Sequence, residues 1–270
     1  MSPPRRIPTA LSIAGSDSGG GAGIQADLKA FARCGVYGTT AITAITAQNT
    51  RAVEAVEPVS PTMVFNQILA VAEDMGADAV KIGMLGSPET IDAVAVGLTY
   101  GGVALAPVVI DPVMVAESGA PLIDDATTDA LVSHLLPRCT LATPNIPEAR
   151  RLTGLGESAS QEELARGVLE LGPKGVVVTG GHSEEVIDVF FDGEQVVEIP
   201  GERHPDGAAH GSGCTHSSAL AALLAHGHDP LQAARAARVI ASEAVANGLR
   251  EVGSGPGPVD VFGLASMPPQ

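Results

Sequence analysis

The stretch "APVVIDPVM" (residues 106–114) is an almost unbroken apolar run that contains one carboxylate and a proline after it. A run of this kind is typical of a strand that is buried on both faces, as in a parallel sheet covered by helices. On either side of it, short apolar runs alternate with amphipathic segments along the chain. This alternation predicts an α/β fold with a mostly parallel central sheet and helices on both faces.

Local sequence signals also predict the individual helices and strands. Proline suits the first position of a helix, so Ser60-Pro61 and Ser87-Pro88 mark helix starts. Asp192-Gly193 at the centre of "VIDVFFDGEQVVEI" (186–199) predicts a β-hairpin. Because no linker or internal repeat interrupts the pattern, we expect residues 1–270 to form a single domain. The expected strands are 9–15, 39–47, 78–85, 106–114, 140–145 and 175–181, and the other expected helices are about 24–34, 61–74, 213–226 and 230–248.

The net charge of the chain limits the kinds of molecule that it can bind. The chain has 31 acidic against 15 basic residues and a net charge of −16. Such a surface repels nucleic acid and anionic membrane, so neither is expected as a partner. No apolar run reaches the length of a membrane span and the first residues lack a signal-peptide pattern, which indicates a cytoplasmic protein. The three widely spaced cysteines argue against a disulfide framework and a structural zinc site.

Glycines, amides and carboxylates recur where the predicted strands end. In an open parallel sheet, ligands bind beyond the carboxyl ends of the strands. Turn chemistry explains any one of these segments, but seven in phase indicate a site at that edge. The segments are "GSDSGGGAG" (15–23), "QN" (48–49), "GML" (83–85), "DP" (111–112), "NIPE" (145–148), "TGGH" (179–182) and "HGSGC" (210–214).

The helix start in "HGSGCTHSSALAAL" (210–223) has two readings. Gly211 and Gly213 let the backbone approach a ligand, and the free N–H groups and dipole of a helix N-terminus bind anions. Alternatively, Ser212 or Thr215 caps an ordinary helix. This stretch alone leaves both readings open.

Familiar nucleotide and metal motifs are missing from the sequence. It has no G-x-x-x-x-G-K-[ST], and the glycines of 15–23 do not fit G-x-G-x-x-G, so neither a P-loop nor a dinucleotide fold is supported. His210 and His216 flank a helix start, where solvated or capping roles are expected.

Six segments, in order, resemble the hydroxymethylpyrimidine/phosphomethylpyrimidine kinases of thiamine biosynthesis, a family of the ribokinase superfamily. The resemblance runs from about Leu11 to Gly257. It implies a ribokinase-like fold and ATP-dependent phosphorylation of 4-amino-5-hydroxymethyl-2-methylpyrimidine and then of its monophosphate. The segments are "AGSDSGGGAGIQADLKAF" (14–31), "TAQNT" (46–50), "KIGML" (81–85), "DPVMVAESG" (111–119), "TPNIPEA" (143–149) and "HGSGCT" (210–215).

The resemblance implies that the terminal phosphate of ATP lies over Gly211, Ser212, Gly213 and Cys214. Cys214 occupies the position where sugar kinases of the superfamily have an aspartate base. A helix N-terminus lowers the pKa of a thiol, so Cys214 is expected to accept the proton of the substrate hydroxyl. The alternative is that Cys214 is a small buried hydrophobic residue.

The resemblance also implies the substrate contacts. Gln48 matches the glutamine that binds the aminopyrimidine edge, for which a carboxamide offers both donor and acceptor. Gly15, Asp27 and Met84 match other positions of that pocket. Asp27 is alternatively a carboxylate that favours the dipole of its own helix.

The remaining implied residues concern the nucleotide. Asp111 and Glu148 are expected to hold Mg²⁺, with Asn145, Glu148 and Thr179 at the phosphates; carboxylates suit this ion. Lys81 either approaches the phosphates or neutralises nearby carboxylates. K⁺ is a further candidate cation, and the resemblance implies a homodimer.

This chain departs from the family pattern at three places. Glu117 and Thr179 replace lysines, and Ala208 and Ala209 replace polar residues before the glycine-rich helix start. Glu117 and Thr179 leave open a non-catalytic pyrimidine sensor, and a pyridoxal or pyridoxine kinase of vitamin B6 salvage also stays open, because its substrate ring is similar and carries a hydroxymethyl group. A sugar kinase is disfavoured because Cys214 replaces the aspartate.

Overall fold

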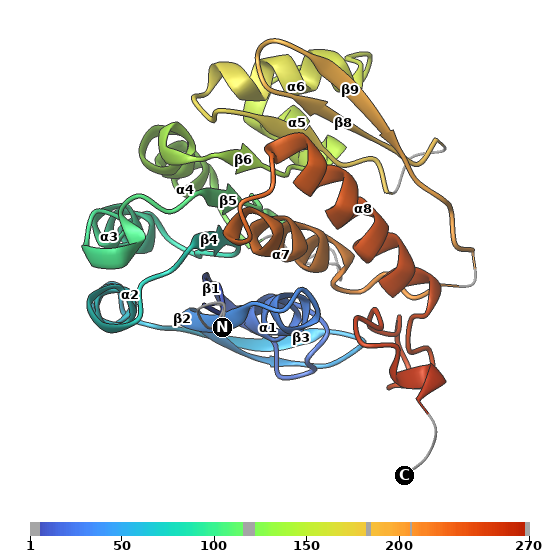
Figure 1. Ribbon diagram of the computed structural model, residues 1–270, viewed down its shortest axis with the longest axis horizontal. Helices are drawn as coiled ribbons and strands as arrows, with labels where there is room; N and C mark the ends of the chain where they lie inside the picture. The colour runs from blue at the N-terminus through green and yellow to red at the C-terminus, as the bar shows by residue number, and fades with distance from the viewer. Residues whose placement is uncertain (1–5, 116–121, 182–184, 206, 268–270) are drawn as a thin grey trace, which may run out of the picture.

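The computed structural model describes residues 6–115, 122–181, 185–205 and 207–267 (Figure 1). Strands and helices alternate along the chain, as the sequence predicts. The strands are β1 Thr9–Ser16, β2 Tyr37–Gln48, β3 Val53–Pro58, β4 Ala79–Ile82, β5 Val108–Ile110, β6 Leu141–Ala142, β7 Val176–Val178, β8 Ile187–Phe191 and β9 Val196–Pro200. The helices are α1 Gly23–Arg33, α2 Pro61–Asp74, α3 Pro88–Gly97, α4 Asp125–Ala130, α5 Ile146–Thr153, α6 Gln161–Glu170, α7 Ser212–Ala225 and α8 Pro230–Ala246. Short helical turns are η1 Gly101–Val103, η2 Leu131–Leu135, η3 Leu136–Arg138 and η4 Leu264–Ser266.

The strands of the described residues form one nine-stranded sheet in the order β3-β2-β1-β4-β5-β6-β7-β8-β9. The central strands β2-β1-β4-β5-β6-β7 are parallel, and β3, β8 and β9 pair antiparallel at the edges. The chain moves from β1 to β2 on one side and later to β4 on the other. The order therefore reverses at β1, which creates a crevice at the carboxyl ends of β1 and β4.

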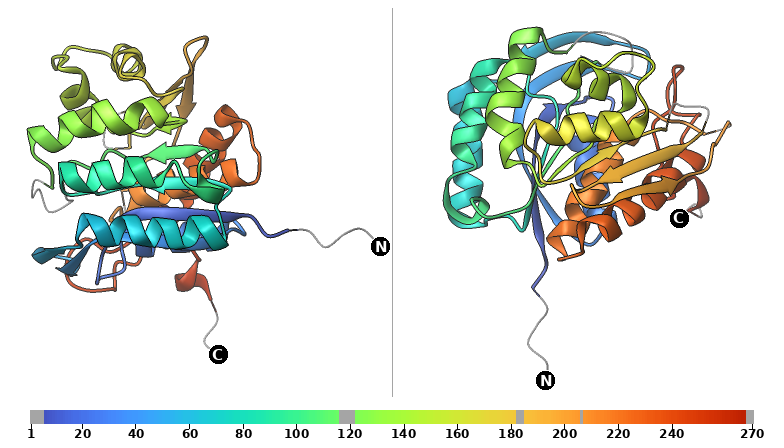
Figure 2. Two further views of the ribbon diagram at one scale, coloured as in Figure 1. Left: turned by 90° about the vertical axis from the view of Figure 1, so that its left-hand side faces the viewer. Right: turned by 90° about the horizontal axis from the view of Figure 1, so that it is seen from above.

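Helices cover both faces of this sheet. Figure 1 shows α2, α3 and α4 on one face and α1, α7 and α8 on the other, and Figure 2 shows the first three side by side. Each face has its own apolar core. Val64, Ile68 and Ile91 belong to the first core, and Phe31, Leu220 and Ala237 to the second. The α/β prediction, with a mostly parallel sheet between two helical layers, is confirmed.

The predicted elements are found, and the hairpin β8–β9 turns at Asp192-Gly193, where Gly193 has φ 93°. Strand β3 and helices α4, α5 and α6 are not among the elements predicted from the sequence. Strand β3 is an exposed, charged edge strand with no apolar alternation to reveal it. Helices α5 and α6 begin with capping boxes, Asn145/Glu148 and Ser160/Glu163, and this local signal identifies helix starts.

Two further sequence expectations concern cysteines and membranes. Cys34, Cys139 and Cys214 are all free thiols. Over the described part of the chain, no helix combines the length and apolar character needed to cross a bilayer.

Candidate active site

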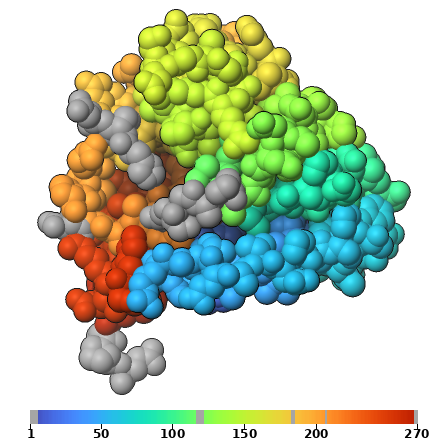
Figure 3. All heavy atoms as spheres, turned by 180° about the vertical axis from the view of Figure 1, so that it is seen from behind, coloured from blue at the N-terminus to red at the C-terminus, as the bar shows by residue number. Residues whose placement is uncertain are grey.

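A cavity of about 530 Å³ opens over the carboxyl ends of the parallel strands and the start of α7. From behind, Figure 3 shows the molecule hollowed between the blue β2–β3 region and the yellow-green chain above it. Most of the residues selected from the sequence line this cavity. They are Gly15, Gln48, Lys81, Met84, Asp111, Asn145, Glu148, Thr179, Gly211, Ser212, Gly213 and Cys214.

The glycine-rich start of α7 lies very close to the backbone of the glycine loop after β1. Gly211 has φ 84°, and a Cβ added to it would lie 1.7 Å from the carbonyl oxygen of Gly21. No side chain caps the helix, so the alternative of an ordinary start capped by Ser212 or Thr215 is wrong. The Ser212 amide donates to Ala209 O (2.9 Å), whereas in the described residues the amides of Gly213 and Cys214 have no acceptor. Two N–H groups are thus available for an anion in the cavity.

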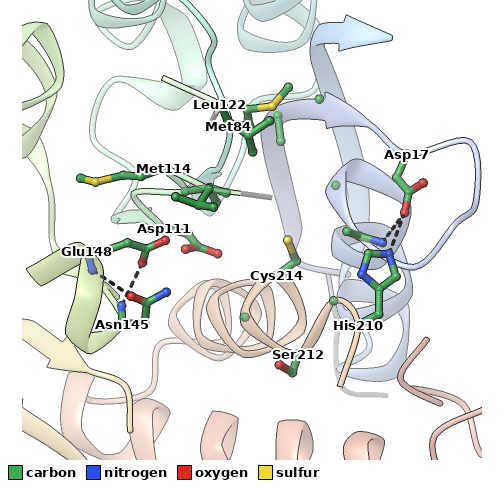
Figure 4. A pocket seen from close by; sticks show the side chains of 18 of the residues that line it. Asp17, Met84, Asp111, Met114, Leu122, Asn145, Glu148, His210, Ser212 and Cys214 are labelled. Carbon is green, nitrogen blue, oxygen red and sulfur yellow. Dashed lines mark hydrogen bonds and ion pairs between the residues drawn. The ribbon is translucent and has the colours of Figure 1, made fainter. Parts of the chain in front are cut away.

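The Cys214 thiol lies at the centre of the site, above the start of α7 (Figure 4). Although part of its surface faces the cavity, burial raises its pKa to about 12, against the opposing charge of Lys81 and a hydrogen bond from the Gly23 amide. Asp27 and Asp111 raise it further. The expectation of a lowered pKa is therefore wrong, since the loss of hydration outweighs the favourable interactions.

Lys81 and Asp27 form an ion pair beneath the cavity, and both side chains are fully buried. The Lys81 ammonium donates to Asp27 Oδ1 (2.9 Å) and Oδ2 (3.1 Å), and the same carboxylate accepts from Ser12 (2.5 Å) and Ser218 (2.6 Å). Asp27 is not among the residues that line the cavity, so its position does not fit the expected substrate contact. It lies beyond the first turn of α1, so the dipole alternative does not fit either. Of the two roles considered for Lys81, the geometry fits neutralising carboxylates.

Two carboxylates, those of Asp111 and Glu148, lie on one side of Cys214 (Figure 4). Burial, followed by the charge of Asp111, raises the pKa of Glu148 to about 8. Burial also raises the pKa of Asp111, against the effects of Lys81 and a hydrogen bond from Ser217 (3.0 Å). The charge of Asp111 thus disfavours the ionised form of Glu148, and repulsion within a pair of oxygen donors is what a divalent cation relieves. These residues therefore fit Mg²⁺.

Asn145 and Glu148 also have a structural task. The Asn145 side chain accepts from the Glu148 amide, and Glu148 accepts from the Asn145 amide, both at 2.9 Å. This capping box opens α5 immediately after β6. The N-x-x-E pattern thus fixes the helix start while presenting a carboxylate and an amide to the cavity.

The opposite end of the cavity is formed by β1, β2 and the segment after β4. Gln48 ends β2, and its side-chain oxygen accepts from Thr46 (3.3 Å). Gly15 leaves room for Met84, since a Cβ there would lie 2.6 Å from Met84 Cε. Val53 also lines this end. A carboxamide beside an apolar wall can bind a flat heteroaromatic ring with polar edge groups.

Asp17 and His210 line the cavity, and neither is among the site residues predicted from the sequence. Asp17 accepts from the amides of Gly19 (2.8 Å), Gly21 (3.0 Å) and Ala22 (2.8 Å), and His210 Nε2 lies 3.4 Å from it. Burial would raise the pKa of Asp17, but the bonds from His210 and these amides hold it below its usual value. Figure 4 places both on the far side of Cys214 from Glu148. Their contact joins residues far apart in the chain, so no local pattern could indicate it.

The structure also tests the expectations for the histidines and for the positions that depart from the family pattern. His216 is buried and His210 lies in the cavity wall, so the expectation of solvated or capping histidines is wrong. Thr179 follows β7 and lines the cavity together with Ala209, while Ala208 is buried. Glu117 lies outside the described residues.

A profile of the phosphomethylpyrimidine kinase family matches residues 17–260. This chain belongs to the phosphomethylpyrimidine kinase family. It is 48% identical over 259 residues to the hydroxymethylpyrimidine/phosphomethylpyrimidine kinase of Rhizobium meliloti (strain 1021), covering 94% of this chain and 96% of that one. The phosphomethylpyrimidine kinase structure from Clostridium difficile 630 matches with a TM-score of 0.77 at 39% identity, covering 88% and 99% of the two chains.

The fold is the ribokinase-like one that the resemblance implied. The pyridoxal kinase of Staphylococcus aureus in complex with AMP-PCP and pyridoxal matches with a TM-score of 0.86 at 32% identity, covering 97% of this chain and 96% of that one. A member of the phosphomethylpyrimidine kinase family is an ATP-dependent kinase, so the sensor alternative is not retained.

Proposed function

We propose that this chain phosphorylates 4-amino-5-hydroxymethyl-2-methylpyrimidine with ATP and then converts the monophosphate to the diphosphate, in thiamine biosynthesis. The observation that carries this proposal is the α7 start. There the amides of Gly213 and Cys214, which have no acceptor among the described residues, face a cavity with Gln48 at one end and Asn145 and Thr179 at another. An acceptor and a nucleotide can therefore meet over one anion-binding backbone segment. Phosphoryl transfer depends mainly on such positioning and on charge neutralisation.

In this proposal, the aminopyrimidine lies against Gly15 and Met84, with its polar edge on the Gln48 carboxamide. Gln48 supplies a donor and an acceptor on adjacent atoms, which matches an amino group next to a ring nitrogen. This orientation directs the 5-hydroxymethyl group towards Cys214.

The nucleotide phosphates lie on the side of Asn145 and Thr179, with the terminal phosphoryl at the amides of Gly213 and Cys214. Asp111 and Glu148 would hold Mg²⁺, which would supply neutralisation of the triphosphate charge. K⁺ remains a further candidate cation, without a residue set to support it.

The first transfer converts the hydroxymethylpyrimidine and ATP into the monophosphate and ADP. The hydroxyl oxygen of the substrate bonds to the γ-phosphorus, the bond from that phosphorus to the β,γ-bridging oxygen breaks, and ADP leaves. Cys214, as thiolate, accepts the hydroxyl proton; with a pKa of about 12 the thiolate is the minor form near neutral pH. In the second transfer, an oxygen of the fully ionised monophosphate attacks, so no proton has to leave.

The structural similarity to pyridoxal kinases favours one second candidate, phosphorylation of pyridoxal, whose ring also carries a hydroxymethyl group. The experiment is ADP release with MgATP and either the hydroxymethylpyrimidine, its monophosphate or pyridoxal, in wild type and in Gln48→Leu. We expect a higher kcat/KM for the pyrimidines, and a loss of that preference in Gln48→Leu. A wild-type preference for pyridoxal would replace the proposed function by vitamin B6 salvage.

The family resemblance also motivates a cytoplasmic homodimer made by one domain of residues 1–270. Sedimentation velocity of the full chain tests the assembly. A monomer at micromolar concentration would contradict it.

A further inference from the structure

Arg151 lines the active-site cavity, and neither the sequence reading nor the proposed mechanism gives it a role. It belongs to α5, on which Pro147, Glu148 and Arg151 are spaced i, i+1 and i+4. This spacing places the three residues on one face of the helix. All three line the cavity, so that face of α5 forms part of its wall.

The cavity has few cations for a ligand as negatively charged as ATP. Among its described lining residues, lysine and arginine occur only as Lys81 and Arg151, against the carboxylates of Asp17, Asp111 and Glu148. The Lys81 ammonium is fully buried and paired with Asp27. Of these two cations in the described cavity lining, Lys81 is paired with a buried carboxylate and Arg151 is not.

The present contacts of Arg151 are weak ones. Its Nη2 atom lies 3.1 Å from Asp125 Oδ1 and donates to Ile123 O at 3.4 Å. The Asp125 side chain is 99% exposed and that of Arg151 is 33% exposed, and such surface pairs contribute little. A long side chain held in this way can exchange these contacts for a stronger anion at small cost.

We propose that Arg151 binds the β- and γ-phosphates of the nucleotide. The helix that carries it follows β6 and begins with Asn145, and Asn145 bridges to Thr179 after β7, whereas Gln48, Gly15 and Met84 lie across β1, β2 and β4. Arg151 is thus on the nucleotide side of the cavity, and the proposal rests on that assignment. The guanidinium fork matches phosphate oxygens in a bidentate way, which a neighbouring backbone amide cannot do.

Arg150 provides a matched control. Both arginines lie in the last turn of α5 and favour its dipole equally, but Arg150 donates to Glu157 O (2.8 Å) and does not line the cavity. Removing either one changes the net charge by the same amount at adjacent positions. A difference in nucleotide affinity between the two variants therefore indicates a direct contact with the nucleotide, and not only a change in the electrostatic field of the protein.

The test is isothermal titration of wild type, Arg151→Ala, Arg151→Gln, Arg151→Lys and Arg150→Ala with MgATP, MgADP, AMP and the hydroxymethylpyrimidine. We expect Arg151→Ala and Arg151→Gln to raise the Kd for MgATP about 10- to 100-fold and Arg151→Lys to raise it less, because a charge-assisted hydrogen bond is lost or weakened. Affinity for AMP and for the pyrimidine should stay within about twofold, as should all affinities of Arg150→Ala.

Two results would overturn the proposal: equal losses in Arg150→Ala and Arg151→Ala, or unchanged MgATP affinity in Arg151→Ala and Arg151→Gln. A loss of kcat/KM confined to the monophosphate substrate would also overturn it, by placing Arg151 at the acceptor phosphate instead. The proposed function fails in a different way, namely through a wild-type preference for pyridoxal as acceptor, which leaves the MgATP affinities of the arginine variants unaffected.

Discussion

Lys81 Nζ lies 2.9 Å from Asp27 Oδ1, and neither side chain is exposed to solvent. The pair joins β4 to α1, and through Ser12 and Ser218 it also holds β1 and α7. In register, Ser12 is the neighbour of Lys81 across β1 and β4. Asp27 therefore accepts hydrogen bonds from groups on β1, β4 and α7, and the charges of Asp27 and Lys81 act on the Cys214 thiol.

Asp27→Asn should destabilise the protein. It removes the hydrogen-bonded counter-charge of the buried Lys81 ammonium, and the loss of one partner of a buried ion pair costs about 3–5 kcal/mol. The measurement is the free energy of unfolding in urea. Glu162→Gln is the control, since it breaks the half-exposed pair with Arg166 and should cost less than about 1 kcal/mol. Asp27→Asn with wild-type stability but a raised KM for the pyrimidine would restore the substrate-contact role for Asp27.

Gly211→Ala should abolish kinase activity. The added Cβ would meet Gly21 O at 1.7 Å, so the start of α7 has to move away from the glycine loop after β1. Gly227→Ala is the matched control: Gly227 has φ 82° and no atom within 4 Å of an added Cβ. The Gly227→Ala variant adds only the backbone strain of a left-handed alanine, about 1–2 kcal/mol, so its kinase activity should be unchanged. Equal activity losses in the two variants would argue against a special role of the α7 start.

Cys214→Ala should slow the first transfer far more than the second, because only the hydroxyl acceptor loses a proton. With a pKa of about 12 the thiolate fraction rises about tenfold per pH unit, so the first transfer in wild type should accelerate steadily from pH 7 to 9 without a plateau. Steady-state rates with each acceptor across this range provide the measurement. A pH-independent first transfer, or equal losses for both acceptors, would assign Cys214 a packing role.

Metal-free protein should lose stability as the pH rises. Burial and the charge of Asp111 raise the pKa of Glu148 from 4.5 to about 8, so folding is favoured while Glu148 is protonated. This contribution is complete below about pH 4.5 and is lost as the pH approaches 8. In EDTA, Glu148→Gln should therefore flatten the fall in melting temperature between pH 5 and 9. The same slope in wild type and Glu148→Gln would contradict the raised pKa.

The sequence predicts those parts of the structure that depend on residues close together in the chain. Buried strands such as 106–114 and the Asp192-Gly193 turn are visible in hydrophobic pattern and turn chemistry. The capping box at Asn145 was equally local, yet its motif was read only as a phosphate and metal site. Pairings across the fold could not be foreseen: Lys81 with Asp27, Asp17 with His210, and the burial that raises the pKa of Cys214 depend on which segments the sheet brings together.

The central claim is that one cavity performs two successive transfers on a pyrimidine. The most direct measurement is ³¹P NMR of a single reaction containing the chain, MgATP and the hydroxymethylpyrimidine. The account predicts that a monophosphate resonance appears and then declines as diphosphate resonances grow, with two ADP formed per pyrimidine. Accumulation of monophosphate alone, or no phosphorylated pyrimidine while pyridoxal is phosphorylated, would contradict it.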